Sequence, residues 1–403
     1  MQFTTPPPLS LYVHLPWCLV KCPYCDFNSH AVRGAAPPPE DAYVDALIAD
    51  LEAELPAVWG RAVSSVFFGG GTPSLFSAAA LERLLSALRA RLQILPDAEI
   101  TLEANPGSFE QDKFGAFRAA GINRLSIGVQ SFDDARLAAL GRVHDAAEAR
   151  RALAIARAAG FEAINLDLMY GLPGQDLRGA LADLDAAIEL APEHLSWYQL
   201  NIEPNTLFHA RPPALPDDDR IADMQDAGGA RLAAAGFEQY ETSAWAQPGQ
   251  RCRHNLNYWT FGDYLGIGAG AHQKLTDCAA GAIRRRHKQR QPAAYLRGEY
   301  LGGESTVAAD ELVFEFMLNA LRLCEGFPAA LFAERTGLPL GAALPGLQAA
   351  EARGLIERDH LHIRPSELGQ RFLNDLQALF LPDGETAATG IGTTGGALPL
   401  RAR

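Results

Sequence analysis

The chain has 403 residues, of which 48% are hydrophobic and 21% are charged, and its formal net charge is −13. This length exceeds the usual ceiling for one compact domain, so we expect one large domain and a smaller one. The acidic excess argues against a surface that binds nucleic acid or anionic lipid through bulk electrostatics. No apolar run reaches the roughly 18 residues of a membrane span, and residues 1–10 lack signal-peptide features. We therefore predict a cytoplasmic protein.

From residue 10 to about residue 200, short apolar runs alternate with amphipathic stretches. The runs predict strands at 11–15, 65–68, 99–103, 124–129, 163–169 and 194–200. The amphipathic stretches predict helices at 41–55 (ending before Pro56), 81–92, 146–159 and 180–190. This alternation is typical of a parallel α/β architecture. Strands that each end in a polar or glycine-rich loop suit a barrel or partial barrel, with its active site at their carboxyl ends.

A second region begins near residue 306. Its pattern predicts helices at 311–323, 328–336 and 344–353, then a hairpin formed by 355–358 and 361–364. Three helices and a small wing resemble a winged-helix module, but no helix is densely basic, so we expect no nucleic-acid partner. We predict an N-terminal extension (1–9), an α/β domain with a following segment (10–305), a C-terminal domain (306–380) and a disordered tail (381–403), which is rich in Gly, Thr and Ala.

Six cysteines are too few for a disulfide scaffold, but three of them, Cys18, Cys22 and Cys25, fall within eight residues. Three thiolates on a short loop after a strand can converge on three corners of a metal cluster. Buried structural cysteines, or a zinc site completed by His14 or His30, are the alternatives. The favoured interpretation is an iron–sulfur cluster held by three cysteines, with one iron open to an external ligand.

The Cys18-x3-Cys22-x2-Cys25 spacing after a first strand resembles the radical SAM superfamily. In that family the open iron binds the amino and carboxylate groups of S-adenosylmethionine (SAM). Gly69-Gly70-Gly71-Thr72-Pro73 ends the second strand, where the family's glycine motif contacts the methionine end of SAM without an obstructing Cβ. With residues 127–132 and 165–173, these motifs resemble the oxygen-independent coproporphyrinogen III oxidase-like group over residues 9–375. The resemblance implies a radical SAM partial (β/α)6-type barrel with a C-terminal helical, winged-helix-like domain.

The resemblance also implies a set of SAM contacts. Three of these residues, Glu103, Gln130 and Asp167, lie at or near predicted strand ends, where polar side chains can hold ribose hydroxyls. Arg142 can pair with a carboxylate. No residue is assigned a catalytic role. The complete set of implied SAM contacts is Tyr12, Tyr24, Gly70, Gly71, Thr72, Glu103, Gln130, Arg142 and Asp167.

The chain departs from the oxidases in two places. The oxidases carry a fourth cysteine two residues beyond the third, and that position is Phe27 here. They also have a longer segment before the first strand, which helps to cover the substrate. Both differences argue against decarboxylation of coproporphyrinogen, and whether the chain is an enzyme stays open at this point.

A second motif resembles the heme chaperone branch of the group, the HemW family. It consists of His254-Asn255-Leu-Asn-Tyr258-Trp259, followed by the segment 266–272. An imidazole beside Tyr and Trp can ligate heme iron and offer aromatic surface to a porphyrin. Alternatively, His254 caps a turn and its aromatic neighbours pack in a small core. The basic run 284–288 is either a solvated loop or a partner for heme propionates.

The resemblance as a whole implies a cytoplasmic heme chaperone. Its cofactors would be a [4Fe-4S] cluster on Cys18, Cys22 and Cys25, SAM at the open iron, and heme with His254 as the leading ligand. Its partners would be heme, heme-accepting proteins such as respiratory enzymes, and an electron donor for the cluster. We expect no nucleic acid and no transmembrane segment, while peripheral contact with a membrane stays open. The alternative is an oxygen-independent coproporphyrinogen III oxidase, or another radical SAM enzyme acting on a porphyrin.

Overall fold

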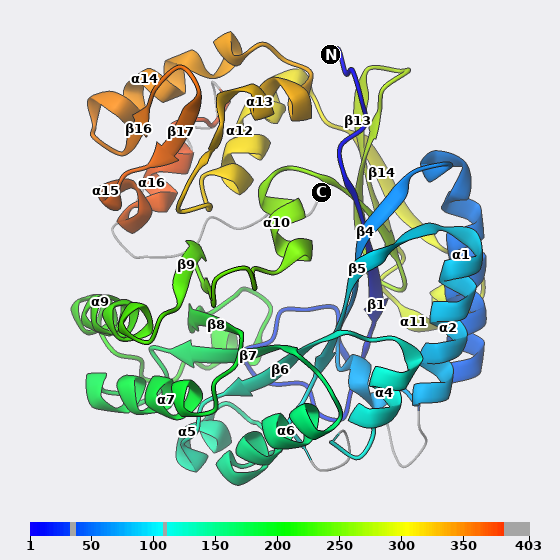
Figure 1. Ribbon diagram of the computed structural model, residues 1–403, viewed down its shortest axis with the longest axis vertical. Coiled ribbons are helices and arrows are strands. Elements are labelled where there is room, and N and C mark those ends of the chain that lie inside the picture. Colours follow the sequence, from blue (N-terminus) through cyan, green and yellow to red (C-terminus); the bar gives the residue numbers. More distant parts are fainter. Residues whose placement is uncertain (33–37, 108–110, 383–403) are drawn as a thin grey trace.

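The computed structural model describes residues 1–32, 38–107 and 111–382 (Figure 1). All six predicted strands are present and lie side by side in chain order, in parallel. The sheet that contains them is open, with β14 and β9 at its edges, so the predicted parallel α/β partial barrel is confirmed. The six strands are β1 (Leu9–Leu15), β4 (Ala62–Gly70), β5 (Gln93–Ala104), β6 (Arg124–Gln130), β7 (Ala163–Tyr170) and β8 (His194–Gln199).

Helices cover the outer face of this curved sheet (Figure 1). The predicted helices are present, although α1 continues past Pro56 to Val58. A proline in the last turn costs few backbone hydrogen bonds, and Val58 is buried in the core. The helices of this region are α1 (Glu40–Val58), the 3-10 turn Pro73–Leu75, α2 (Ala78–Arg91), α4 (Phe114–Ala120), α5 (Asp134–Ala139), α6 (Ala146–Ala158), α7 (Leu177–Glu189), α8 (Leu207–Ala210) and α9 (Asp218–Ala234).

The two faces of the parallel strands have different chemistry. In β1, Leu11 and Val13 are buried with the helices in the main hydrophobic core. Successive side chains of a strand point to opposite faces, so Tyr12 and His14 lie on the inner face. The inner side of the partial barrel is therefore polar, and its outer side is apolar.

Strands beyond the six extend the sheet at both edges. β9 (Glu238–Glu241) and β10 (Ala244–Ala246) pair antiparallel beyond β8. β11 (Asp263–Ile267) pairs parallel with β1, and β12 (His272–Asp277), β13 (Ala282–Lys288) and β14 (Leu301–Thr306) follow antiparallel. α10 (Arg253–Trp259) lies inside the curve of the sheet, and α11 (Pro292–Tyr295) precedes β14 (Figure 1).

The basic run 284–288 is strand β13, so the prediction of a solvated loop is wrong. Arg284 and Arg286 pair with Glu304 of the neighbouring strand, at 3.3 and 3.0 Å. Lys288 Nζ lies 2.6 Å from Asp50 and 2.7 Å from Glu54 of α1. The positive charges are therefore neutralised within the fold, which also removes the reason to assign them to heme propionates.

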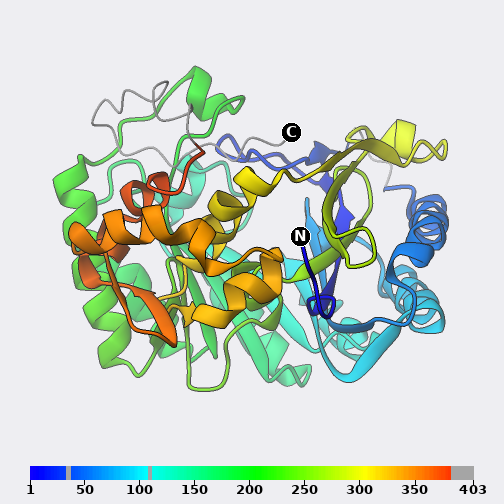
Figure 2. The same ribbon diagram turned by 90° about the horizontal axis from the view of Figure 1, so that it is seen from above.

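The C-terminal region has the predicted helices and hairpin, and it builds a hydrophobic core of its own around residues such as Phe316, Leu347 and Ile363. Figure 2, which looks from above, shows its helices in front of the sheet. Its elements are α12 (Ala309–Ala320), β15 (Phe327–Pro328), α13 (Ala329–Thr336), the 3-10 turn Leu340–Ala343, α14 (Leu344–Ala352), β16 (Ile356–Arg358), β17 (His362–Pro365), α15 (Glu367–Arg371) and α16 (Leu373–Ala378).

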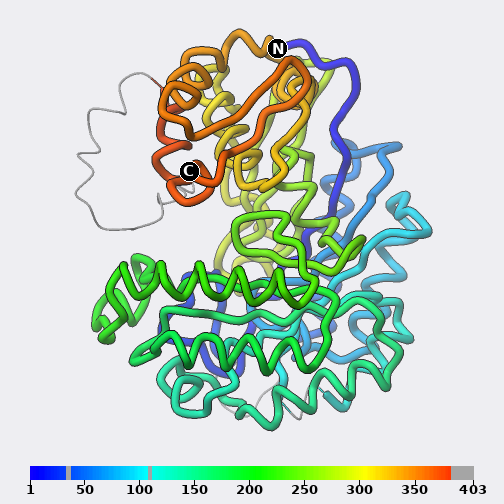
Figure 3. The backbone as a smooth tube through the Cα atoms, turned by 60° about the vertical axis from the view of Figure 1, so that its left-hand side comes forward, coloured from blue at the N-terminus to red at the C-terminus, as the bar shows by residue number. Residues whose placement is uncertain are grey.

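The start of the chain lies against this C-terminal core, as the tube in Figure 3 shows. Met1 and Phe3 pack on it, and the backbone N–H of Gln2 donates to the carbonyl of Gly337 at 3.1 Å. The predicted disordered tail lies outside the described residues, apart from Leu381 and Pro382. Among the described residues, no helix is both long and apolar enough to cross a membrane.

Candidate functional site

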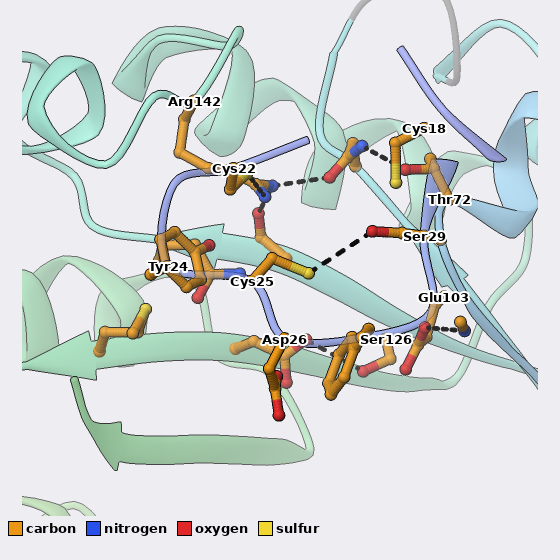
Figure 4. A pocket seen from close by; sticks show the side chains of 18 of the residues that line it. Cys18, Cys22, Tyr24, Cys25, Asp26, Ser29, Thr72, Glu103, Ser126 and Arg142 are labelled. Atoms are coloured by element: carbon orange, nitrogen blue, oxygen red, sulfur yellow. Dashed lines mark hydrogen bonds between the residues drawn. The ribbon is translucent and has the colours of Figure 1, made fainter. Parts of the chain in front are cut away.

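A polar cavity of about 320 Å³ opens at the carboxyl ends of the parallel strands (Figure 4). It lies where a parallel α/β fold places its ligands. Eleven of the thirteen residues selected from the sequence line this one cavity, and the other two, Tyr12 and His254, do not. The eleven are Cys18, Cys22, Tyr24, Cys25, Gly70, Gly71, Thr72, Glu103, Gln130, Arg142 and Asp167.

The cysteine loop is closed by a short parallel pair, β2 (Trp17–Cys18) with β3 (His30–Ala31). Across the loop, Lys21 Nζ donates to the carbonyls of Phe27 and Ser29, at 3.0 and 3.4 Å. The backbone N–H of Cys25 donates to the carbonyl of Cys22 at 3.2 Å. The three cysteines are therefore held on a loop that is fixed at both ends and braced in the middle.

The three thiols face the cavity and have polar neighbours (Figure 4). Arg142 Nη1 donates to Cys22 Sγ at 3.6 Å, and Ser29 Oγ lies 3.7 Å from Cys25 Sγ. Burial raises the pKa of the Cys18 and Cys25 thiols, and a bound metal overcomes this by displacing the thiol proton.

The donor set can be compared with two kinds of centre. Within the described part of the chain, no three His, Cys, Asp or Glu side chains converge on a position for one metal ion. A cubane cluster requires a different arrangement, in which the thiols surround the cluster and do not meet at one point, because each cysteine binds a separate iron. Three thiols around a polar cavity fit that requirement.

The glycine motif after β4 fastens this strand to the cysteine loop. The backbone N–H groups of Gly71 and Thr72 donate to the carbonyls of Leu15 and Trp17, at 2.9 and 2.7 Å. A Cβ on Gly71 would lie 2.5 Å from the Trp17 carbonyl oxygen, and Gly70 has a positive φ of 114°. The glycines are therefore required by close packing against β1 and the cysteine loop, in addition to any approach of a ligand.

Two half-buried carboxyl groups, Glu103 and Asp167, lie in the cavity wall. Burial, together with the nearby charge of Asp167, raises the pKa of Glu103 to about 8. Burial also raises the pKa of Asp167, against hydrogen bonds from Asn165 at 2.7 Å and Ser126 at 3.3 Å. The backbone N–H of Gly70 donates to Glu103 Oε2 at 3.2 Å. A carboxyl group that is partly protonated at neutral pH can both donate and accept hydrogen bonds, which suits hydroxyl and amino partners.

Arg142 and Gln130 are held in place by neighbouring loops and strand ends. Arg142 Nη2 donates to Asn105 Oδ1 at 2.6 Å and to the carbonyl of Gly128 at 2.7 Å. Gln130 ends β6 with a positive φ of 69°, and Tyr198 donates to its Oε1 at 2.9 Å. This conformation costs a non-glycine residue about 1 kcal/mol or more, and such outliers concentrate at functional sites.

Several residues of the cavity wall were not selected from the sequence. They include Asn105, Ser126 and Tyr198. Asn105 follows β5 directly, and its polar side chain at the carboxyl end of a parallel strand is the signal that could have identified it. Phe27, the position that distinguishes the chain from the oxidases, lies at the cavity with 59% of its surface exposed.

Tyr12 and His254 lie on the inner face but outside the cavity lining. The His254 ring stacks on Phe67, with ring centroids 4.9 Å apart, and its Nδ1 lies 3.0 Å from Ser65 Oγ. Only 3% of His254 is exposed, and burial lowers its pKa to about 3. Its Nε2 is buried without a hydrogen-bond partner among the described residues. His254 therefore faces the protein interior instead of capping a turn.

The fold and this site define a radical SAM protein. The family model described as the Radical SAM superfamily matches residues 12–187, and the model of the HemN C-terminal domain matches residues 307–372. In a search of solved structures, the coproporphyrinogen III oxidase HemN from Escherichia coli, described as a radical SAM enzyme, matches with a TM-score of 0.79 and 26% identity. This match covers 93% of the present chain and 90% of HemN.

Curated relatives narrow the assignment. The protein named heme chaperone HemW from Escherichia coli (strain K12) is 52% identical over 377 residues, which cover 94% of this chain and 99% of the relative. HemW from Haemophilus influenzae is 49% identical over 381 residues, with the same coverage of 94% and 99%. The chain belongs to the HemW family.

Proposed function

We propose that the protein is a heme chaperone that binds heme and passes it to acceptor proteins, such as respiratory enzymes. We further propose that it carries a [4Fe-4S] cluster on Cys18, Cys22 and Cys25, with SAM in the polar cavity. The observation that carries the proposal is the three-thiol loop at this cavity in a chain whose relatives are named heme chaperones.

The residues of the cavity would hold SAM by complementary chemistry. The Arg142 guanidinium suits the SAM carboxylate, and Glu103 and Asp167 suit its amino and ribose hydroxyl groups. A cluster bound at the three thiols would supply electron transfer and an open iron for the amino acid end of SAM. The chain itself would orient SAM and shield it from water at the half-buried carboxyl groups.

Heme is the cargo of this proposal. The sequence points to His254 as its ligand, and Tyr258 does pack on that imidazole, with ring centroids 5.1 Å apart. Because the His254 side chain is buried, iron would reach its Nε2 only after α10 moves away from β4. Whether the chain binds heme and which residue ligates the iron are therefore tested separately.

Titration of the full chain with hemin tests the proposal. The cluster is first reconstituted without oxygen, and the Soret band is followed as hemin is added. We expect saturable binding, followed by release of the heme to the apo form of a heme-requiring respiratory enzyme when the two are mixed. If the loaded chain transfers no heme, or the free chain binds none, the chaperone function is wrong.

The similarity to HemN favours a second candidate, oxidation of coproporphyrinogen III. The test is anaerobic incubation of the reconstituted chain with SAM, a reductant and coproporphyrinogen III. Phe27 stands where the oxidases have a further thiol, so we expect no protoporphyrinogen IX. Its formation at a rate comparable to that of HemN would replace the chaperone proposal with an enzymatic one.

A further inference from the structure

Strands β11 to β14 extend the sheet beyond β1, and their inner face carries a row of cross-strand neighbours on β12, β13 and β14. We call this the imidazole row, after His272 and His287. His272 is opposite His287, and His287 is opposite Gly303. Residues opposite each other in a sheet point to the same face. The row therefore continues the inner face that carries Tyr12 and, through Tyr264 of β11, the aromatic end of α10.

The two imidazoles of this row are stacked and free. Their ring centroids are 5.7 Å apart and their planes differ by 29°. The His287 ring lies over β14, where a Cβ on Gly302 or Gly303 would come within 2.7 or 2.5 Å of it. Within the part of the chain that the structure describes, no hydrogen bond engages a ring nitrogen of His272 or His287. The glycines thus make room for a pair of rings whose nitrogens are unused.

His272 has the properties of an available iron ligand. The residue is exposed, in contrast to His254. An imidazole has an ordinary pKa of about 6.5, which lies below physiological pH. The imidazole is therefore neutral at physiological pH, and a neutral imidazole is the form that ligates a metal.

Arg290 provides an unpaired positive charge beside this imidazole. Arg284, Arg285, Arg286 and Lys288 all pair with carboxylates, whereas no ion pair among the described residues involves the exposed Arg290. A free guanidinium repels a bare divalent cation and attracts a carboxylate. The combination of neutral imidazole and free guanidinium fits an iron porphyrin, which brings both a metal and propionates.

We infer that His272 is the axial ligand through which this protein takes up heme, with Arg290 pairing a propionate. The inference rests on the proposed heme-binding function and changes its ligand from His254 to His272. Residues of α10 then support this site indirectly, through a chain of ring contacts. Tyr258 joins His254 to Tyr264, whose ring lies 4.4 Å away, and Tyr264 Oη accepts from Arg285 Nη1 at 3.1 Å.

Hemin titration of the full chain with single variants tests this inference. We expect His272→Ala to weaken hemin binding tenfold or more and to change the Soret position, because the axial ligand is lost. Binding of iron-free protoporphyrin IX should change by less than twofold, since it needs no ligand. Arg290→Ala should weaken both porphyrins by a similar small factor. His360→Ala, an exposed histidine on the C-terminal hairpin, is the matched control and should leave hemin affinity unchanged.

His254→Ala separates the two ligand assignments. If His272 ligates the iron, this variant keeps the wild-type Soret position and loses at most about threefold in affinity through weaker support of Tyr258. A changed spectrum in His254→Ala together with an unchanged one in His272→Ala overturns the inference. So does Zn²⁺ binding that His272→Ala removes while hemin binding is untouched. If the wild type binds no hemin, the proposed function itself fails, which is a different result. Iron content and circular dichroism verify that each variant is folded.

Discussion

The polar cavity at the ends of β1–β8 and the imidazole row on β12–β14 belong to one sheet but are built differently. In the cavity, Arg142 donates to Asn105, Gln130 accepts from Tyr198, and Asp167 accepts from Ser126 of the neighbouring strand β6. In the row, His272 is exposed and its ring nitrogens have no such partners in the described structure. A preorganised site suits a resident group, and an open one suits a cargo that must leave again.

Asn28 connects the two regions. Its side chain donates to the carbonyls of Ala269 and Arg290, both at 2.9 Å, and its own carbonyl accepts from His14 Nε2 at 2.9 Å. Asn28, which lies within the cysteine loop, is thus bonded to the segment that carries Arg290. A change in the cysteine loop can in this way reach the imidazole row formed by His272 and His287.

The largest effect is expected from Cys22→Ser. Iron retained after anaerobic reconstitution should fall about tenfold or more, because a three-cysteine cluster has no spare ligand. Hemin affinity should fall much less, since the imidazole row lies on other strands. Iron and sulfide analysis with a parallel hemin titration measures both. Cys278→Ser is the control, and full iron retention in Cys22→Ser would show that the cluster is held elsewhere.

The next largest effect is expected from Glu103→Gln. This variant should reduce the pH dependence of the free energy of unfolding by a few kcal/mol. The folded-state pKa of Glu103, about 8, is raised above its usual value, mainly by burial. Such a group contributes stability at low pH that is lost as the pH rises toward 8, by on the order of a few kcal/mol. Glutamine cannot ionise, so the variant should lose less stability between pH 5 and pH 8 than the wild type.

Urea unfolding across this pH range measures the effect of Glu103→Gln. Glu82→Gln, an exposed carboxylate on α2, is the control and should follow the wild type. The pKa of Asp167 is also raised by burial, so part of the pH dependence of stability should remain in Glu103→Gln. Identical slopes in all three proteins would contradict the raised pKa of Glu103.

The smallest effect, on both regions at once, is expected from Asn28→Ala. It removes two side-chain hydrogen bonds, each worth about 1 kcal/mol. We expect the cluster to be lost to a chelator severalfold faster and hemin to bind a fewfold more weakly. Asn319→Ala removes a comparable side-chain hydrogen bond within α12. It should change neither the rate of cluster loss nor the hemin affinity. An effect on the cluster alone would mean that the two regions are independent.

The sequence predicts well those elements that depend on the local pattern of apolar and polar residues. The six parallel strands are short apolar runs, and the cavity residues follow from their ends because parallel strands bring those ends to one edge. Glu103, Asp167 and the cysteine loop lie at these ends although they are far apart in the chain, and the resemblance to a known family is what implied their roles.

The remainder depends on partners that no local pattern contains. From its sequence, β13 is a basic run that could be solvated. In the structure, Asp50 and Glu54, more than 200 residues earlier, supply counter-charges to its Lys288. His254 looks like an accessible ligand until α10 turns it toward Ser65 and Phe67. In both cases long-range packing decides whether a polar side chain faces solvent or the interior.

Gly270 makes room for the side chain that links the two regions. It has a positive φ of 89°, and a Cβ there would collide with the side-chain amide of Asn28. The two positions are 242 residues apart, yet a side chain at one excludes the amide at the other. Any residue with a Cβ at position 270 would therefore displace this amide and remove its hydrogen bonds to the carbonyls of Ala269 and Arg290.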